Sequence, residues 1–155
     1  MPSFNLISYT NQANILAAAK NIDPSGTRTS TMQPSEFVFF IAWADNIINS
    51  KLSPVCVTPL RQIVRNGVTG FPEPIEFIAT QLAAGYMVES IYSRVEPEIS
   101  ESGKTHKDNA MKHLEDLAGG ALVGSIRLDG QSLKARNSFV NPNVVPLDPP
   151  KPGNY

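Results

Sequence analysis

The chain has 155 residues, 41% of them hydrophobic, and carries a net charge of −1 at neutral pH. This length and composition suit one buried core, so we expect a single domain. A near-neutral chain lacks the basic excess with which DNA-binding proteins neutralise phosphates, which disfavours DNA binding as the main function. The single cysteine, Cys56, excludes an internal disulfide, and the first residues contain no basic start followed by a long apolar run. We therefore expect neither secretion nor a membrane span.

Two helices are predicted in the first third of the chain. Thr10 can cap an alanine- and leucine-rich helix from about residue 11 to 21. The polar segment 23–34, rich in helix-breaking residues, should then form a flexible loop. Ser35 can cap a second helix, which should continue through Leu52.

The second predicted helix is apolar on two sides. Its larger stripe, at helical spacing, comprises Phe37, Phe40, Ile41, Ala44, Ile48 and Leu52. Phe39 and Trp43 lie on the other side and need a cover of their own. Asp45, Asn46 and Asn49 form a polar cluster on the same helix. This cluster could be a polar interface network, although a solvated helix face is the favoured interpretation.

A third helix is predicted after an irregular segment. Prolines and glycines interrupt residues 53–72, where we expect at most a short strand or helical turn near 60–64. Pro74 suits the first turn of a helix, because its missing amide would have no intrahelical partner there. We expect this helix to run to about Arg94.

The third helix is apolar almost all the way round. One stripe comprises Ile75, Ile78, Ala79, Leu82 and Tyr86. A nearly opposite stripe comprises Phe77, Ala84, Val88, Ile91 and Val95, with Tyr92 beside it. A central helix buried within one chain would account for this pattern. The small number of other predicted elements instead favours partial burial by a second subunit.

The fourth predicted helix follows an acidic turn at residues 96–104. Thr105 and Asp108 make a capping-box pattern, T-x-x-D, at its expected start. Gly119 and Gly120 should end it in a left-handed backbone conformation. Its predicted buried face comprises Ala110, Met111, Leu114, Leu117 and Ala118.

The C-terminal part should contain a hairpin and an extended arm. Asp129 and Gly130 favour a two-residue turn inside a short β pattern at about 121–136. Residues 137–155 contain five prolines and no amphipathic period, which predicts an extended arm. The expected fold is therefore mainly α: a four-helix bundle-like domain at 1–136 that includes the small hairpin, followed by the arm.

No sequence pattern indicates a catalytic, metal or cofactor site. His106 and His113 are seven residues apart and fit no common zinc spacing, so a solvated helix surface is the favoured interpretation. Cys56 lies between two valines, where a small buried thiol is favoured over a nucleophile. The glycines of segment 65–70, RNGVTG, lack the spacing of a phosphate-binding loop.

Three segments resemble the head-to-tail connector proteins, also called adaptor or head-completion proteins, of tailed double-stranded DNA bacteriophages. They are ADNIINSKLSPV, PEPIEFIATQLAAGYMVES and DNAMKHLEDLAGGALVG, within residues 35–125. The matching positions are Ala44, Asp45, Ile48, Leu52, Ser53, Pro54, Pro74, Ile78, Leu82, Ala110, Leu114, Leu117, Ala118 and Gly120. Asn49 stands where a carboxylate is usual, and the loop 55–72 is longer than the short link usual in this family.

The resemblance implies a non-enzymatic virion protein that forms a ring, typically of twelve copies, between the portal and the tail or neck proteins. Double-stranded DNA would pass through the ring without sequence-specific binding, and a near-neutral channel would let it slide. Neighbouring subunits would meet through two different faces. The expected subunit interface comprises Phe39, Trp43, Phe77, Val88 and Ile91. The arm would dock on the portal through Phe139, Val144, Val145, Leu147 and Tyr155.

Two other functions stay open from the sequence. The runner-up is a small oligomeric helical adaptor or regulatory module that binds a protein partner, and a small enzyme comes third. No cofactor, metal or membrane association is expected for the connector.

Overall fold

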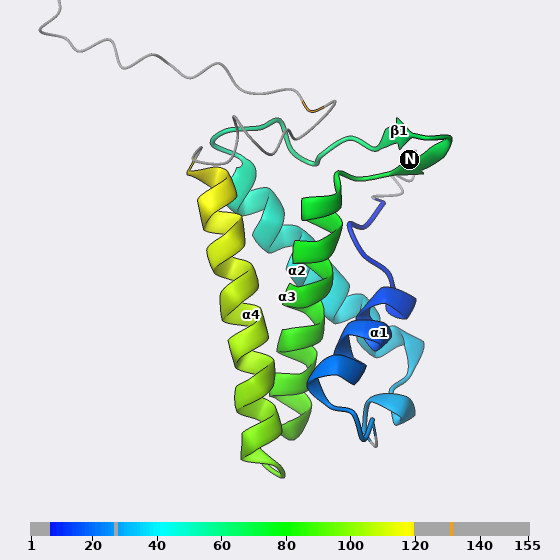
Figure 1. Ribbon diagram of the computed structural model, residues 1–155, viewed down its shortest axis with the longest axis vertical. Coiled ribbons are helices and arrows are strands. Elements are labelled where there is room, and N and C mark those ends of the chain that lie inside the picture. Colours follow the sequence, from blue (N-terminus) through cyan, green and yellow to red (C-terminus); the bar gives the residue numbers. More distant parts are fainter. Residues whose placement is uncertain (1–6, 27, 120–130, 132–155) are drawn as a thin grey trace, which may run out of the picture.

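The computed structural model describes residues 7–26, 28–119 and 131, which form a helical bundle with a small β-hairpin (Figure 1). The elements in chain order are α1 (Gln12–Ile22), a 3-10 turn (Thr29–Thr31), α2 (Pro34–Leu52), β1 (Ile63–Arg65), β2 (Val68–Gly70), α3 (Glu73–Tyr92) and α4 (Pro97–Ala118). The predicted mainly helical class is thus confirmed, and the observed hairpin is a different one from the hairpin predicted at 121–136. In the described part of the chain, no helix combines the length and hydropathy that crossing a membrane requires.

Helix α3 is the central element of the bundle. Helix α4 runs alongside it, α1 packs on another side, and α2 crosses behind it in the view of Figure 1. Side chains from both predicted stripes, such as Leu82 and Val88, are fully buried. The other helices of the same chain therefore cover most of the apolar surface of α3. A second subunit is not needed to account for the burial of Val88.

The backbones of α3 and α4 approach closely at two glycines. A Cβ atom added at Gly85 would lie 2.7 Å from both the carbonyl oxygen of Gly103 and the amide nitrogen of Lys107. A Cβ atom added at Gly103 would lie 2.7 Å from the amide nitrogen of Glu89. Any side chain at either position would push the two helices apart, and this explains glycine in the middle of each helix.

Helix α4 begins about two turns before the predicted start. Pro97 occupies its first position and Glu98 its first turn, so the expected acidic turn at 96–104 is helical. Thr105 is in mid-helix, and its hydroxyl donates to the carbonyl oxygen of Glu101 at 2.9 Å. Gly119 has φ −68°, in the right-handed region, so the expected left-handed end is wrong at this residue.

The two N-terminal caps also differ from the prediction. Asn11 caps α1 by accepting from the amide of Asn14 at 2.9 Å, whereas the hydroxyl of Thr10 bonds to that of Thr80 at 2.8 Å. Helix α2 is capped at Gln33, whose backbone amide donates to the side-chain carboxylate of Glu36 at 2.7 Å. Polar residues next to the actual caps were thus mistaken for them.

A hairpin forms within the segment 53–72 that was expected to be mainly irregular. Strands β1 and β2 are antiparallel, with Val64 opposite Thr69, and Asn66 and Gly67 form the turn at φ 52° and 78°. Positive φ at both turn residues matches the type I′ turn that Asn-Gly favours. The hairpin predicted at 121–136 and the arm at 137–155 lie outside the described residues, apart from Gln131, whose side-chain amide bonds to the backbone of Arg61.

A buried carboxylate orders the loop after α1. Asp23 accepts hydrogen bonds from the hydroxyl of Tyr92 and from the hydroxyl and amide of Ser25, and it is 1% exposed. Burial alone raises the pKa of Asp23, but the hydrogen bonds from Ser25, Tyr92 and the amide of Gly26 outweigh it and lower the pKa overall. This part of the predicted flexible loop is therefore tied to the end of α3.

The helix contact predicts a loss of stability on Gly103→Ala. Helix propensity alone would favour alanine by about 1 kcal/mol, but forced separation of the helices should cost about 1–3 kcal/mol. We expect the net result to be a lower Tm by circular dichroism. The control is Asn109→Ala on the exposed side of α4, which should leave the Tm unchanged or raise it. An equal rise in Tm for both variants would contradict the close contact.

The Asp23 network predicts a pH-dependent contribution to stability. A pKa lowered on folding stabilises the protein above the unfolded value of about 3.9, and the contribution is lost as pH falls through the folded pKa. Asp23→Asn should therefore cost about 1–3 kcal/mol at pH 7 and clearly less near pH 3. Thermal melts at both pH values, with the exposed Asp108→Asn as control, test this. A deficit of equal size at both pH values would rule out the ionic contribution.

Candidate functional site

Three aromatic side chains form an apolar patch on the outer surface of α2 and α3. The aromatic patch comprises Phe39, Trp43 and Tyr86. The Tyr86 ring lies 4.5 Å from that of Trp43 and 6.2 Å from that of Phe39, measured between centroids. Phe39 is 59% exposed, whereas Trp43 and Tyr86 are half-buried. Phe39 is thus a protruding apolar side chain on a firmly packed aromatic base.

A lysine of α4 borders this patch. The Lys107 ammonium lies 5.6 Å from the centre of the Tyr86 ring and also pairs with Glu89. Lys104, one turn earlier, is exposed and lies 4.0 Å from Glu101. The patch therefore combines apolar area with one cation at its edge, Lys107, which is itself paired with Glu89.

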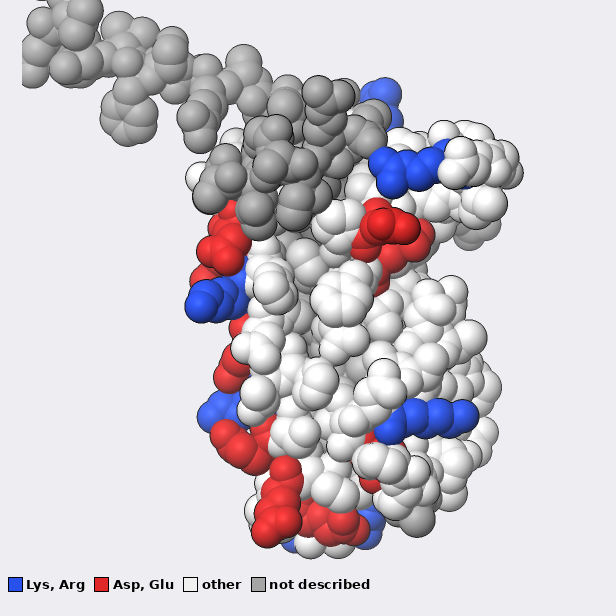
Figure 2. Space-filling view, viewed as in Figure 1, with Lys and Arg blue, Asp and Glu red and all other residues white. Residues whose placement is uncertain are grey.

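A second apolar surface lies between α1 and the beginning of α3. The Phe77 groove is a hollow of about 640 Å³ lined by Asn14, Ala17, Glu73, Pro74, Glu76, Phe77 and Thr80. Phe77 is 58% exposed. Figure 2 shows uncharged surface over much of α3, with acidic side chains gathered at its beginning beneath the hairpin. The groove therefore combines apolar surface from Ala17, Pro74 and Phe77 with two carboxylates, Glu73 and Glu76.

The aromatic patch and the Phe77 groove face in different directions. Tyr86 follows Phe77 by nine residues on α3, which corresponds to about two and a half helical turns. The two side chains thus leave α3 on opposite sides. Tyr86 meets α2 and α4, whereas Phe77 points to the side of α1.

The five residues expected at a subunit interface do not lie together. Phe39 and Phe77 are exposed on these opposite surfaces, and Trp43 and Ile91 are half-buried. Val88 is 0% exposed because α4 covers it at Gly103, so it offers no surface to another chain. Tyr86 was assigned to the core stripe, and its part in the aromatic patch was missed. Its position one turn from the polar Glu89 and Ser90 was the available signal.

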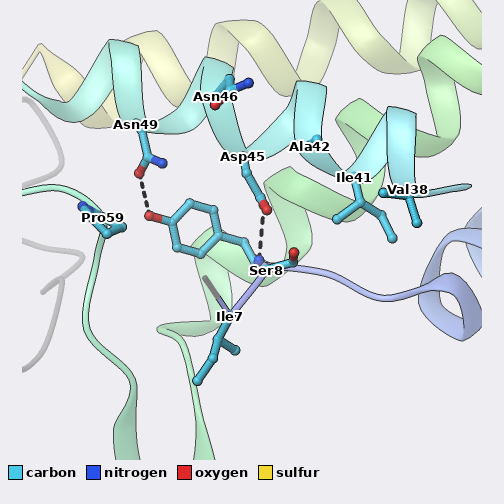
Figure 3. A pocket seen from close by; sticks show the side chains of 10 residues that line it. Ile7, Ser8, Val38, Ile41, Ala42, Asp45, Asn46, Asn49 and Pro59 are labelled. Carbon is cyan, nitrogen blue, oxygen red and sulfur yellow. Dashed lines mark hydrogen bonds between the residues drawn. The ribbon is translucent and has the colours of Figure 1, made fainter. Parts of the chain in front are cut away.

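The polar cluster of α2 binds the N-terminal segment (Figure 3). The Tyr9 amide donates to Asp45 at 3.0 Å, and the Tyr9 hydroxyl donates to Asn49. The same hydroxyl accepts from the buried amide of Leu60 at 2.8 Å. The favoured interpretation of a solvated face is therefore wrong for Asp45 and Asn49, which make contacts within the chain.

These contacts leave a small pocket beside Tyr9. Its volume is about 260 Å³, and its walls include Val38, Ile41 and Pro59 together with the polar cluster. Burial raises the pKa of Asp45, and hydrogen bonds from the Tyr9 amide and Ser8 only partly offset this. Burial is also the main cause of the raised pKa of Tyr9. The contacts beside the pocket thus hold the N-terminal segment and the backbone at Leu60 against α2.

Other potentially reactive residues lie apart from these surfaces. Cys56 is buried as predicted, and burial raises the pKa of its thiol, which disfavours the reactive thiolate. His113 is exposed, while His106 is half-buried against Gln81 at 3.1 Å. Within residues 7–26, 28–119 and 131, no three histidine, cysteine or carboxylate side chains gather as a possible metal site.

The chain matches no protein-family model, and searches of curated proteins and of solved structures find no match. The two apolar surfaces and the motif resemblance are therefore the basis for a functional proposal.

The Tyr9 contacts predict a specific loss of stability. Tyr9→Phe removes the hydroxyl and leaves the buried Leu60 amide without its partner, which should cost about 1–3 kcal/mol. Urea or thermal unfolding measures this loss. Asn46→Ala, on the exposed edge of the same pocket, is the control and should change stability by less than about 0.5 kcal/mol. Equal losses of stability for the two substitutions would show that the hydrogen bond between the Tyr9 hydroxyl and the Leu60 amide does not stabilise the fold.

Proposed function

We propose that this chain is a structural, non-enzymatic subunit of a closed ring in a head-to-tail connector of a tailed double-stranded DNA bacteriophage. The observation that carries the proposal is the exposure of Phe39 and Phe77 on opposite sides of one small bundle. Contiguous exposed apolar patches on a compact protein commonly mark interaction sites, and each of these two side chains belongs to one. Two such sites in different directions suit a subunit that contacts a neighbour on each side.

Ring geometry requires this arrangement. In a closed ring, one face of each subunit meets a different face of the next, whereas a two-fold dimer uses the same face twice. The aromatic patch and the Phe77 groove differ in shape and in charge, as a head-to-tail contact requires. Together they favour a ring over a simple dimeric adaptor.

The resemblance supports the same function through the positions of its motif residues. Ala44, Ile48 and Leu52 of α2 are buried, as are Leu82 of α3 and Leu114 of α4. These motifs therefore supply the core of the bundle and leave its surface free to bind other proteins. Such a subunit would act as a rigid spacer rather than as a catalyst.

The proposed partners are further copies of the chain, the portal, and a tail or neck protein. In the virion, the ring would stand at the capsid vertex, and its net charge of −1 per subunit would avoid tight binding of passing DNA. We propose that residues 137–155 attach to the portal, since proline restricts their conformations and lowers the entropy lost on docking. Their apolar anchors are Phe139, Val144, Val145, Leu147 and Tyr155.

The proposal predicts assembly and attachment that can be measured separately. Native mass spectrometry and negative-stain microscopy at high concentration should show closed rings in equilibrium with monomers. Cosedimentation should show the full chain binding to particles that contain portal. The truncated chain 1–136 should remain helical by circular dichroism and bind these particles more weakly.

One outcome would contradict the whole proposal, and another would contradict only the role of the arm. A stable dimer that never binds portal particles would favour the smaller adaptor module. Attachment of the truncated chain as tightly as the full chain would remove the role of the arm while leaving the ring intact.

A further inference from the structure

The aromatic patch has the form of a ridge with a single protruding side chain. Phe39 is 59% exposed and packs edge-to-face on the buried Phe40 ring at 5.3 Å. Tyr86 of α3 lies against it, and Trp43 of α2 packs on the Tyr86 ring at 4.5 Å between centroids. A rigidly held aromatic side chain surrounded by packed neighbours is typical of residues that dominate binding energy at interfaces.

The Phe77 groove is a wide hollow, open to solvent, on the opposite side of α3. Ala17, Pro74 and Phe77 give it an apolar surface on which an aromatic side chain can pack. Glu73 and Glu76 add negative charge at one end. A partner for this hollow must bring apolar area to cover Phe77. It must also bring cationic or neutral groups to the end that holds the two glutamates.

We propose that Phe39 of one copy inserts into the Phe77 groove of a second copy, so that Lys107 approaches Glu73 and Glu76. This inference rests on the proposed function, because it names the two faces that meet in the ring. The inserted aromatic group would supply the affinity, and the charges at the edge would favour the correct orientation.

Charge favours a contact between the groove of one copy and the aromatic patch of the other over a contact between two grooves. Two grooves facing each other would bring Glu73 and Glu76 against their own copies, and like charges oppose such a contact. The aromatic patch instead has Lys107 over Tyr86, and the carboxylate of Glu89 is paired with this lysine. The patch can therefore approach the acidic end of the groove without adding unpaired negative charge from Glu89.

Mixing two assembly-deficient variants tests this pairing. Phe39→Asp removes the inserted side chain but keeps the groove, whereas Phe77→Asp spoils the groove but keeps the inserted side chain. Each variant alone should stay monomeric, with its apparent dissociation constant weakened about tenfold or more. An equimolar mixture should form a heterodimer that grows no further, because only one intact contact can form. Native mass spectrometry distinguishes the two variants by mass.

Several outcomes overturn the inference. If both variants are folded monomers and their mixture contains no heterodimer, the two faces do not meet. Such a result would leave the ring itself possible, with each face binding a different surface of the neighbouring subunit. If either variant alone assembles like the unsubstituted chain, its phenylalanine is not in the interface. An unsubstituted chain that never assembles would remove the proposed function as well.

A second measurement covers the case in which an aspartate variant fails to fold. A chain carrying both Phe39→Cys and Phe77→Cys should give a ladder of multimers with a short bismaleimide, since Cys56 is buried and should react slowly. The single-cysteine variants should give no ladder. Dimers of Phe39→Cys alone, without a ladder from the double variant, would indicate a two-fold contact and overturn the pairing.

Discussion

The direct backbone contact between α3 and α4 at Gly85 and Gly103 is the constraint on which the bundle depends. Because the two helices meet without intervening side chains, α4 covers Val88 and the adjoining part of α3 completely. The remaining sides of α3 are then open to α1 and α2. A sequence that is apolar almost all round can thus belong to a helix buried largely within one short chain.

Polar contacts complement this apolar packing at both ends of α1. Tyr9, just before the helix, bonds to Asp45 and Asn49 of α2, and Asp23, just after it, bonds to Tyr92 of α3. The two carboxylates differ electrostatically, since the pKa of Asp45 is raised by burial while hydrogen bonds lower that of Asp23. Helix α1 is therefore fixed by two directional anchors, which hold its side of the Phe77 groove in place.

Local patterns predicted the helices well, whereas contacts between distant segments were not predictable. Helix propensity located α1, and hydrophobic spacing located the other three helices, although α4 begins about two turns earlier than predicted. The same spacing identified Phe39 and Phe77 as surplus apolar residues. The burial of Val88 depends on a close contact between two helices, which no local pattern indicates. The hydrogen-bond donor to Asp45 is the amide of Tyr9, 36 residues away in the sequence. The hairpin turn is different, because Asn66 and Gly67 carried a recognisable signal that was considered only as a phosphate-binding motif.

The distance between the two surfaces along α3 has a consequence for the symmetry of any assembly built from them. Nine residues separate Tyr86 from Phe77, which amounts to about 13 Å along the helix axis. Suppose that α3 stood parallel to the assembly axis and that the aromatic patch of one subunit met the Phe77 groove of the next. Each subunit would then be displaced along the axis relative to the one before it, and the assembly would be an open helical filament. Closure without such a rise requires α3 to be inclined to the ring axis. The tilt of this one helix would thus decide between a finite channel and an endless fibre.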